Sequence, residues 1–177
     1  YIQKKNNTVI SSYTKTVYFE KKPILIGERI NPTGKSRFKA ALREKNYDYI
    51  LQEGVAQQDA GADVLDVNVG LPEIDEAEVL TESVKLLQAV TDLPLQIDTT
   101  NPKAMENALR IYNGKPLINS VNGKKEVMDE IFPLAAKYGG VVIALTIDEN
   151  GIPDSASGRI EIAEKIISEA KKYGIES

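Results

Sequence analysis

The pattern that decides the fold is clearest in Pro94-Leu95-Gln96-Ile97-Asp98-Thr99-Thr100-Asn101-Pro102. Residues 94–97 predict a short strand, and Asp98 stands where that strand ends. Asn101 and Pro102 then predict the start of a helix, because Asn suits the capping position and Pro suits the first helical position. The stretch therefore indicates a strand that leads through a polar turn into a helix.

The same unit recurs along the chain. Strands are predicted at 23–26, 62–67, 94–97, 116–118 and 141–145, and apolar residues recur at helical spacing after each of them. The helical stripes are Tyr47, Ile50, Leu51 and Val55; the apolar positions of 75–90; Met105, Ala108, Leu109 and Tyr112; Val127, Ile131, Leu134 and Ala135; and Ile160, Ala163, Ile167 and Ala170.

Short apolar strands that alternate with helices are typical of a parallel sheet covered by helices. Such a sheet is either doubly wound or closed into a barrel. A complete eight-stranded barrel needs roughly 250 residues, and this chain has 177. If the fold is a barrel, the sequence predicts an incomplete one of about five β/α units.

Two segments are expected. Residues 1–22 are polar with a β-prone spot at Thr16-Val17-Tyr18-Phe19, so they are interpreted as a linker or lead-in segment. Residues 23–177 carry the repeating unit and form the barrel part. The chain begins with Tyr1 rather than Met, which suggests a piece of a longer protein.

Composition narrows the chemistry. The sequence contains no Cys and no His. Disulfides, thiolate nucleophiles, thiolate metal sites, imidazole metal ligands and His-based triads are therefore excluded for this chain. Proton transfer and polar recognition must use Asp, Glu, Lys, Tyr, Asn, Ser or Thr, and no metal is expected to be bound.

Charge and hydropathy predict the setting. The 22 basic and 26 acidic residues give a net charge of −4, with the basic residues scattered along the chain, so nucleic acid is not an expected partner. The longest apolar run, at 141–145, is too short to span a bilayer, so no membrane partner is expected either. We expect a cytoplasmic protein.

Polar residues follow every predicted strand, and in parallel α/β folds the carboxyl ends of the strands line the ligand site. Glu28, Asp98 and Asn119 stand directly at apolar strand ends, where an unpaired polar group is costly to bury, so a ligand role is favoured for them. Asp66 suits either a ligand or neighbouring backbone. Local capping or turn roles are predicted for Asn101, Asn122 and Asp148.

The candidate residues suit a neutral heterocycle rich in hydrogen-bond donors. A carboxylate can accept two parallel N–H bonds from a ring N–H and an exocyclic amine. Asn119 could offer both a donor and an acceptor to the opposite edge of such a ring.

Four motifs in order carry a family resemblance: Gly27-Glu28-Arg29-Ile30-Asn31-Pro32-Thr33-Gly34-Lys35, Asp66-Val67-Asn68-Val69-Gly70, Ile97-Asp98-Thr99-Thr100-Asn101 and Leu117-Ile118-Asn119-Ser120. Together they closely resemble the pterin-binding methyltransferase family. That family includes the methyltetrahydrofolate-binding domains of cobalamin-dependent methionine synthases and the methyltetrahydrofolate:corrinoid/iron–sulfur protein methyltransferases. The resemblance covers about residues 23–177.

The resemblance implies a (β/α)8 TIM barrel of the dihydropteroate synthase-like type, with the pterin at the carboxyl ends of the strands. Asp98 and Asn119 match the positions that hydrogen-bond the pterin ring. Cofactor-binding roles are likewise implied for the remaining motif residues, Glu28, Asn31, Gly34, Lys35, Ser36, Asp66 and Asn68. No residue of this chain is assigned as catalytic.

The implied activity is binding of 5-methyltetrahydrofolate and presentation of its N5-methyl group to cob(I)alamin in a methionine synthase-type methyltransferase. The cobalamin would be carried by a corrinoid domain or a corrinoid protein, and a homocysteine-binding domain would belong to the parent protein. Family members have further pterin contacts on later strands, which this chain does not reach. Two alternatives stay open: dihydropteroate synthase-like condensation, which the loop Gly70-Leu71-Pro72-Glu73 disfavours, and a non-catalytic pterin-binding fragment.

Overall fold

A computed structural model of the chain describes residues 7–19 and 22–176, and its centre is a parallel sheet. Five strands lie in the order β3-β4-β5-β6-β7, and each neighbouring pair runs parallel. The strands are β3 (Ile26–Ile30), β4 (Val64–Val67), β5 (Leu95–Asp98), β6 (Leu117–Asn122) and β7 (Val141–Leu145). The order follows the sequence, as in a barrel that grows one β/α unit at a time.

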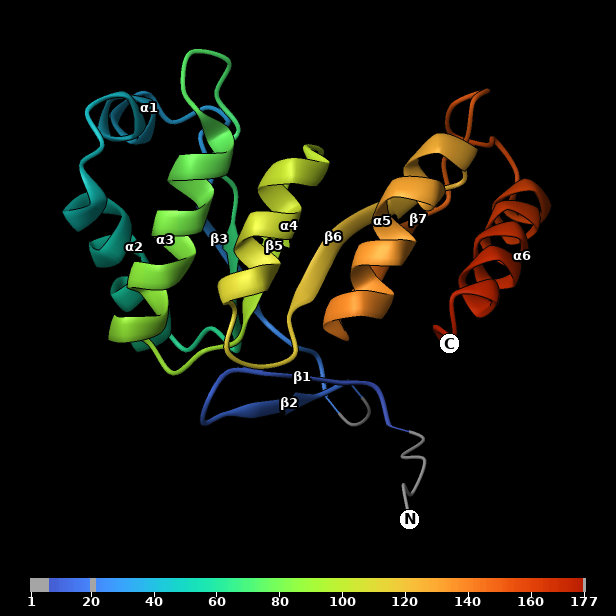
Figure 1. Ribbon diagram of the computed structural model, residues 1–177, viewed down its shortest axis with the longest axis horizontal. Coiled ribbons are helices and arrows are strands. Elements are labelled where there is room, and N and C mark those ends of the chain that lie inside the picture. The colour runs from blue at the N-terminus through green and yellow to red at the C-terminus, as the bar shows by residue number, and fades with distance from the viewer. Residues whose placement is uncertain (1–6, 20–21, 177) are drawn as a thin grey trace.

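The helices cover one face of this sheet, as Figure 1 shows. They are α1 (Ser36–Arg43), α2 (Tyr47–Asp59), α3 (Glu76–Val90), α4 (Pro102–Ile111), α5 (Lys125–Tyr138) and α6 (Ala156–Lys172). The main hydrophobic core lies between these helices and the outward-facing strand residues, among them Leu65, Ile97 and Ile118. The predicted fold class, an α/β partial barrel, is therefore confirmed, and β3 and β7 are the two edges of the described sheet.

Three local expectations differ from the structure. The first strand begins at Ile26 rather than Pro23, because its pairing with β4 starts at the Ile26–Val64 pair. The segment between β3 and β4 holds two helices, since α1 precedes the predicted α2. In α6, Ile160 is 58% exposed, whereas Ile162 and Ile166 are buried. That helix carries two apolar faces, and it turns the unpredicted one toward α5 and β7.

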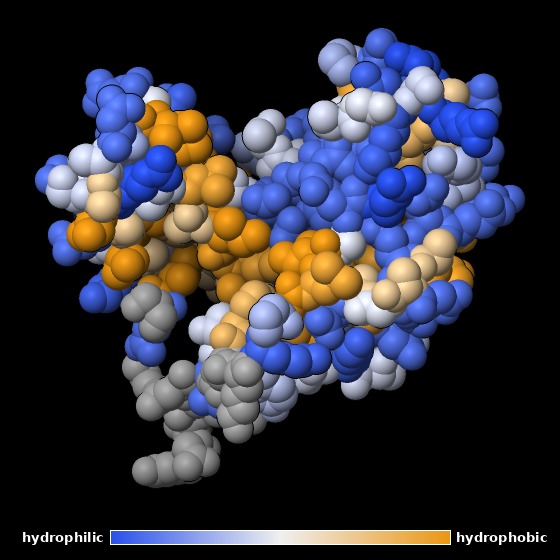
Figure 2. Space-filling view, turned by 180° about the vertical axis from the view of Figure 1, so that it is seen from behind, coloured by the Kyte–Doolittle hydropathy of each residue, from blue (hydrophilic) through white to orange (hydrophobic). Residues whose placement is uncertain are grey.

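The inner face of the sheet is divided into an apolar base and a polar top. Val64 and Leu117 point inward near the beginning of their strands and form a second core with Ile10 and Val17. Figure 2 shows this face, with hydrophobic surface across the lower middle and up the left side of a hollow, and hydrophilic surface above and to the right. Because alternate strand residues share a face, the sequence of each strand sets where this division falls.

A hairpin closes the base of the sheet (Figure 1). It consists of β1 (Val9–Ser11) and β2 (Thr16–Tyr18), which pair antiparallel and lie in the segment interpreted as a linker or lead-in. Residues 1–6 and 20–21 of that segment lie outside the described residues. Gly114 allows a close approach here, since a Cβ would lie 2.3 Å from the Ser11 carbonyl oxygen and the φ of +149° disfavours other residues.

Candidate functional site at the strand ends

The inward-facing polar residues gather near the carboxyl ends of the strands. Asp66 pairs across the sheet with Gln96, and Asp98 pairs with Asn119. Asn68 follows β4 directly and joins the same group through Asp98. Asp66 and Asn119 lie within their strands rather than after them, and so does Glu28 of β3. The inner face therefore brings together five of the predicted site residues.

The lower layer of the site is a carboxyl–amide pair between β4 and β5. Gln96 Nε2 donates a short hydrogen bond to Asp66 Oδ1. Asp66 is 1% exposed and Gln96 is 5% exposed. Gln96 Oε1 is buried and has no hydrogen-bond partner among the described residues. The amide thus satisfies the Asp66 carboxyl and leaves its own oxygen unsatisfied.

The upper layer is a second carboxyl–amide pair, in which β5 supplies the carboxyl and the residue directly after β4 supplies the amide. Asn68 Nδ2 donates to Asp98 Oδ2 at 2.8 Å, while Asn68 Oδ1 accepts from the Gly70 backbone N–H at 2.9 Å. Asp98 is only half-buried. Asn68 therefore fixes the Asp98 carboxyl from one side, and the exposed part of this carboxyl is available to a ligand.

Both carboxyls hold their protons more tightly than an ordinary Asp. Burial is the main cause that raises the pKa of Asp66 to about 7, and the neighbouring Asp98 and Glu28 raise it further. The hydrogen bond from Gln96 and the charge of Lys35 act in the opposite direction. Burial also raises the pKa of Asp98, and Glu28 and Glu76 add to it against the hydrogen bond from Asn68. Raised carboxyl pKa values in a concave, solvent-facing group are a mark of functional sites.

The first-strand motif forms a compact loop beside this group. Asn31 is buried, and its Nδ2 donates to Glu28 Oε1 at 3.2 Å while its Oδ1 accepts from the Thr33 N–H at 2.9 Å. Lys35 Nζ donates to the backbone carbonyls of Glu28 and Arg29 at 2.8 and 3.1 Å. Asn31 and Lys35 therefore hold the loop at the end of β3, so their cofactor-binding roles stay predictions.

Gly34 and Ser36 have local positions in the same loop. Gly34 is exposed in the turn at a φ of +71°, and Ser36 is the first residue of α1. Gly34 has no side chain, and within residues 7–19 and 22–176 no hydrogen bond joins Ser36 to the carboxyl–amide pairs. Their predicted cofactor roles also stay predictions.

Three polar residues predicted to have local roles do have them. Asn101 caps α4 by accepting from the backbone N–H groups of Lys103 and Ala104 at 3.1 and 3.3 Å. Asn122 Oδ1 accepts from the Lys124 N–H, and Asp148 Oδ1 accepts from the Asn150 N–H. These are turn and capping contacts of the kind that short polar side chains make.

Sequence reasoning missed two residues of the site. The sequence pattern places Gln96 in a strand without a role in the site, although its spacing of two from Asp98 puts both side chains on one face. A polar residue inside an otherwise apolar strand was the available signal. Glu76, the first residue of α3, accepts a hydrogen bond from Thr99 Oγ1 at 2.5 Å and acts electrostatically on Asp98. Its position depends on how α3 docks, and no local pattern indicates it.

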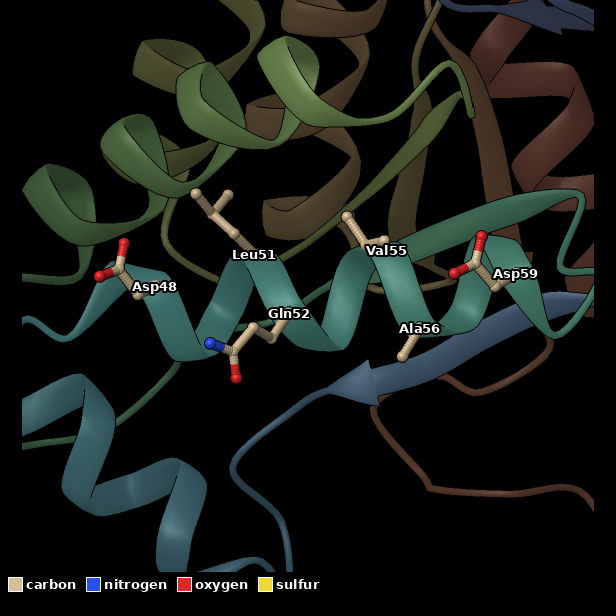
Figure 3. Close-up of a pocket in the computed structure, with 6 residues that line it drawn as sticks. All are labelled: Asp48, Leu51, Gln52, Val55, Ala56 and Asp59. Carbon is tan, nitrogen blue, oxygen red and sulfur yellow. The ribbon is translucent and has the colours of Figure 1, made fainter.

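A separate hollow lies on the outside of α2, away from the strand ends (Figure 3). Its lining comes from a single helix: Asp48, Leu51, Gln52, Val55, Ala56 and Asp59. Leu51 and Val55 point to one side of the helix, and Gln52 and Ala56 point to the other (Figure 3). This surface does not bring together groups from several strands, so the inner face of the sheet remains the candidate site.

Within residues 7–19 and 22–176, no group of three or more acidic side chains is arranged to hold a metal ion. In the same ranges, no helix combines the length and the apolar character needed to cross a bilayer.

A parallel β/α partial barrel with a polar site at the strand ends places the chain in a class of enzymes and binding proteins that hold small molecules at this edge. Residues 27–177 match the model of the pterin binding enzyme family, which is most of the chain. The protein belongs to that family, as the four sequence motifs predict.

Relatives define the family further. The chain is 33% identical over 155 residues to the methylcorrinoid:tetrahydrofolate methyltransferase of Eubacterium limosum, covering 86% of this chain and 56% of the relative. It is 31% identical over 168 residues to the methionine synthase of Mycobacterium tuberculosis, covering 92% of this chain and 14% of that protein. The chain thus spans about half the length of the first relative and a small part of the second.

Solved structures show the same fold at lower sequence identity. The dihydropteroate synthase of Xanthomonas albilineans with 4-aminobenzoic acid superposes with a TM-score of 0.71 at 20% identity, covering 95% of this chain and 61% of that one. The 7,8-dihydropteroate synthase of Vibrio fischeri gives 0.70 at 17% identity, covering 96% and 63%. At these identities the likeness establishes the fold alone.

Proposed function

We propose that this chain binds the pterin ring of 5-methyltetrahydrofolate at the inner strand ends and presents the N5-methyl group for transfer to cob(I)alamin. The relatives named as a methylcorrinoid:tetrahydrofolate methyltransferase and a methionine synthase support this assignment over condensation chemistry. The observation that carries the proposal is the half-buried Asp98 carboxyl, fixed by Asn68 and paired in register with Asn119.

The chemistry of these residues fits a pterin. A carboxylate held by one amide donor keeps acceptor positions for two N–H groups of a heterocycle that carries a ring N–H beside an exocyclic amine. Asn119 lies across from Asp98 on the neighbouring strand and offers an amide N–H and a carbonyl to another edge of the ring. Asp98 and Asn119 would therefore hold the ring, and Asn68 would orient Asp98.

The share of this chain in the reaction is positioning and electrostatics. A cob(I)alamin carried by another domain or protein supplies the nucleophile that accepts the methyl group. This chain has no His or Cys to ligate a corrinoid. Its own residues bind and orient the folate. Departure of the methyl group returns the C–N bonding pair to N5, so N5 must gain a proton, and the acidic inner face favours that positively charged, protonated ring.

The test is a calorimetric titration of the 177-residue chain with 5-methyltetrahydrofolate, with p-aminobenzoate as the control ligand. We expect saturable folate binding and none with p-aminobenzoate. Asp98→Ala should weaken folate binding by about 100-fold or more, since two charge-assisted hydrogen bonds are lost. Asp59→Ala, on the exposed end of α2, is the matched control and should bind normally.

Circular dichroism of both variants checks that they remain folded. Unchanged folate affinity in a folded Asp98→Ala protein would remove the assignment of Asp98. Turnover of a pterin pyrophosphate with p-aminobenzoate would favour the condensation reaction instead. If the chain binds folate but the absorbance of added cob(I)alamin does not fall, the chain is a pterin-binding fragment without methyl-transfer activity.

A further inference from the structure

Two carboxyl–amide pairs are stacked on the inner face, and they differ in burial. In the upper pair the carboxyl is Asp98 on β5, and in the lower pair it is Asp66 on β4. Each carboxyl receives one amide N–H from the neighbouring chain segment. Asp98 is half-buried, whereas Asp66 is almost completely buried. Since burial disfavours the charged form, the lower carboxyl is the less favourable of the two positions for a negative charge.

The charged surroundings of Asp66 point the same way. Glu28 faces it from β3 and Asp98 faces it from β5, and both disfavour a further negative charge. Lys35, in the loop after β3, is the opposing positive charge. The segments of β6 and β7 contain no titratable residue. Three carboxyls therefore face one lysine, whose Nζ is already bound to two backbone carbonyls.

The side-chain amide of Gln96 makes a hydrogen bond to Asp66 but leaves its own oxygen without a donor. Its Nε2 donates to Asp66, while its buried Oε1 lacks a partner among the described residues. A buried acceptor without a donor costs stability, so this arrangement is not explained by the fold alone. It indicates that the carboxyl of Asp66 sets the direction of the amide.

We propose that the Asp66–Gln96 pair lies beneath the ligand site and that its carboxyl is protonated near neutral pH. Asp66 carries the proton that the crowded carboxyls share, and Asp98 above it stays ionised to accept hydrogen bonds. Gln96 is a positioning residue that fixes the Asp66 carboxyl. A ligand that fills the hollow excludes water from the half-buried Asp98 and so strengthens the repulsion between Asp98 and Asp66, which couples binding to uptake of a fraction of a proton. This last coupling rests on the proposed folate function, whereas the location of the proton does not.

The first experiment needs no ligand. Carboxyl carbons of Asp are labelled with carbon-13, and their NMR shifts are followed from pH 4 to 9 in the folded protein. We expect one Asp resonance with a midpoint near neutral pH, lost in Asp66→Asn, which keeps the size of the side chain. Asp63→Asn, three residues earlier beside β4, is the matched control, because the Leu25 N–H holds the pKa of Asp63 below its usual range. The neutral titration should persist in that control.

A second variant isolates the role of Gln96. Gln96→Met keeps the length of the side chain and removes the donor, so the midpoint of the Asp66 titration should rise. An unchanged or lowered midpoint in a folded Gln96→Met protein would overturn the positioning role of Gln96. Persistence of the neutral titration in Asp66→Asn, or the absence of any Asp titrating above pH 5, would overturn the location of the proton.

The coupling to the ligand is tested by calorimetry of 5-methyltetrahydrofolate binding at pH 7.5 in buffers with different ionisation enthalpies. Wild-type protein should take up a fraction of a proton, and Asp66→Asn should take up none. Equal proton uptake in both proteins would overturn the coupling. Absence of folate binding in both would count against the proposed function, and the NMR titration would still decide where the proton is held.

Discussion

The two ends of the sheet differ in whether their polar groups have hydrogen-bond partners. At the base, Tyr112 Oη donates to the Ser11 carbonyl and accepts from the Leu95 N–H, and Ser12 Oγ donates to the Asp92 carbonyl. At the carboxyl ends, Asp66 and Asp98 have raised pKa values and Gln96 Oε1 is unsatisfied. The base satisfies its polar groups and stabilises the fold, whereas the strand ends keep one buried acceptor unsatisfied and leave the half-buried Asp98 carboxyl open to a ligand.

The largest expected effect is at the base. Ile10 is completely buried between the hairpin and the sheet, so Ile10→Ala should lower the free energy of unfolding by about 2–5 kcal/mol. Ile160→Ala, at the exposed position of α6, should change it by less than about 0.5 kcal/mol. Urea unfolding measures both. If Ile10→Ala lowers the free energy of unfolding as little as Ile160→Ala does, the hairpin is not part of the cooperative core.

The second effect tests the cost of the acidic strand ends. Because the folded protein holds the Asp66 proton to about pH 7, against 3.8 for an ordinary Asp, the folded state binds more protons than the unfolded state between these values. The free energy of unfolding should therefore fall as pH rises from about 4 to about 7. At about 1.36 kcal/mol per pKa unit, the ceiling of this loss is about 4 kcal/mol.

Asp66→Asn removes this titration, so its stability should depend less on pH, and at pH 8 it should exceed that of the wild type. Urea unfolding at pH 5 and pH 8 measures the difference. If the wild type instead has a larger free energy of unfolding at pH 8 than at pH 5, Asp66 does not destabilise the fold when it is ionised, and the contrast between the two ends fails for this residue.

A smaller effect is expected from the hydrogen bonds at the base. Tyr112→Phe removes the hydroxyl that joins the hairpin to the start of β5, and the loss should be about 1–3 kcal/mol. Amide exchange at Leu95 should become faster. Tyr18→Phe, in the exposed part of the hairpin, is the control and should have little effect. No change in Tyr112→Phe would mean that water replaces both bonds.

The smallest expected change in stability comes from Asn101, which follows β5 in the sequence but caps the helix α4. Asn101→Ala removes the cap of α4 and should lower the free energy of unfolding by about 1 kcal/mol. Asn107→Ala, inside the same helix, should be neutral or slightly stabilising, since Ala is the better helix former. Folate affinity should remain unchanged in both. Lost affinity in Asn101→Ala alone would place Asn101 among the ligand contacts.

Local patterns in the sequence were enough for the repeating unit. Apolar runs indicated all five sheet strands, although β3 and β6 each extend four residues beyond the predicted end, and Asn101 with Pro102 marked the start of α4. The four motifs indicated the pterin-binding family, which the family match confirms. These features succeed because strand alternation, helical spacing and capping depend on neighbours close in the chain.

Only the tertiary structure decided how these pieces act on one another. The hairpin of residues 9–18 closes the base through contacts with Leu117 and Lys115, about one hundred residues away. The pairing of Asp66 with Gln96 depends on the register between β4 and β5, which brings together residues thirty apart. Burial and the approach of other carboxyls raise the pKa of Asp66, and neither is a property of its neighbours in sequence. The sequence by itself determined the strands, helices and family, while long-range packing determined which polar groups are satisfied and which remain for a ligand or a proton.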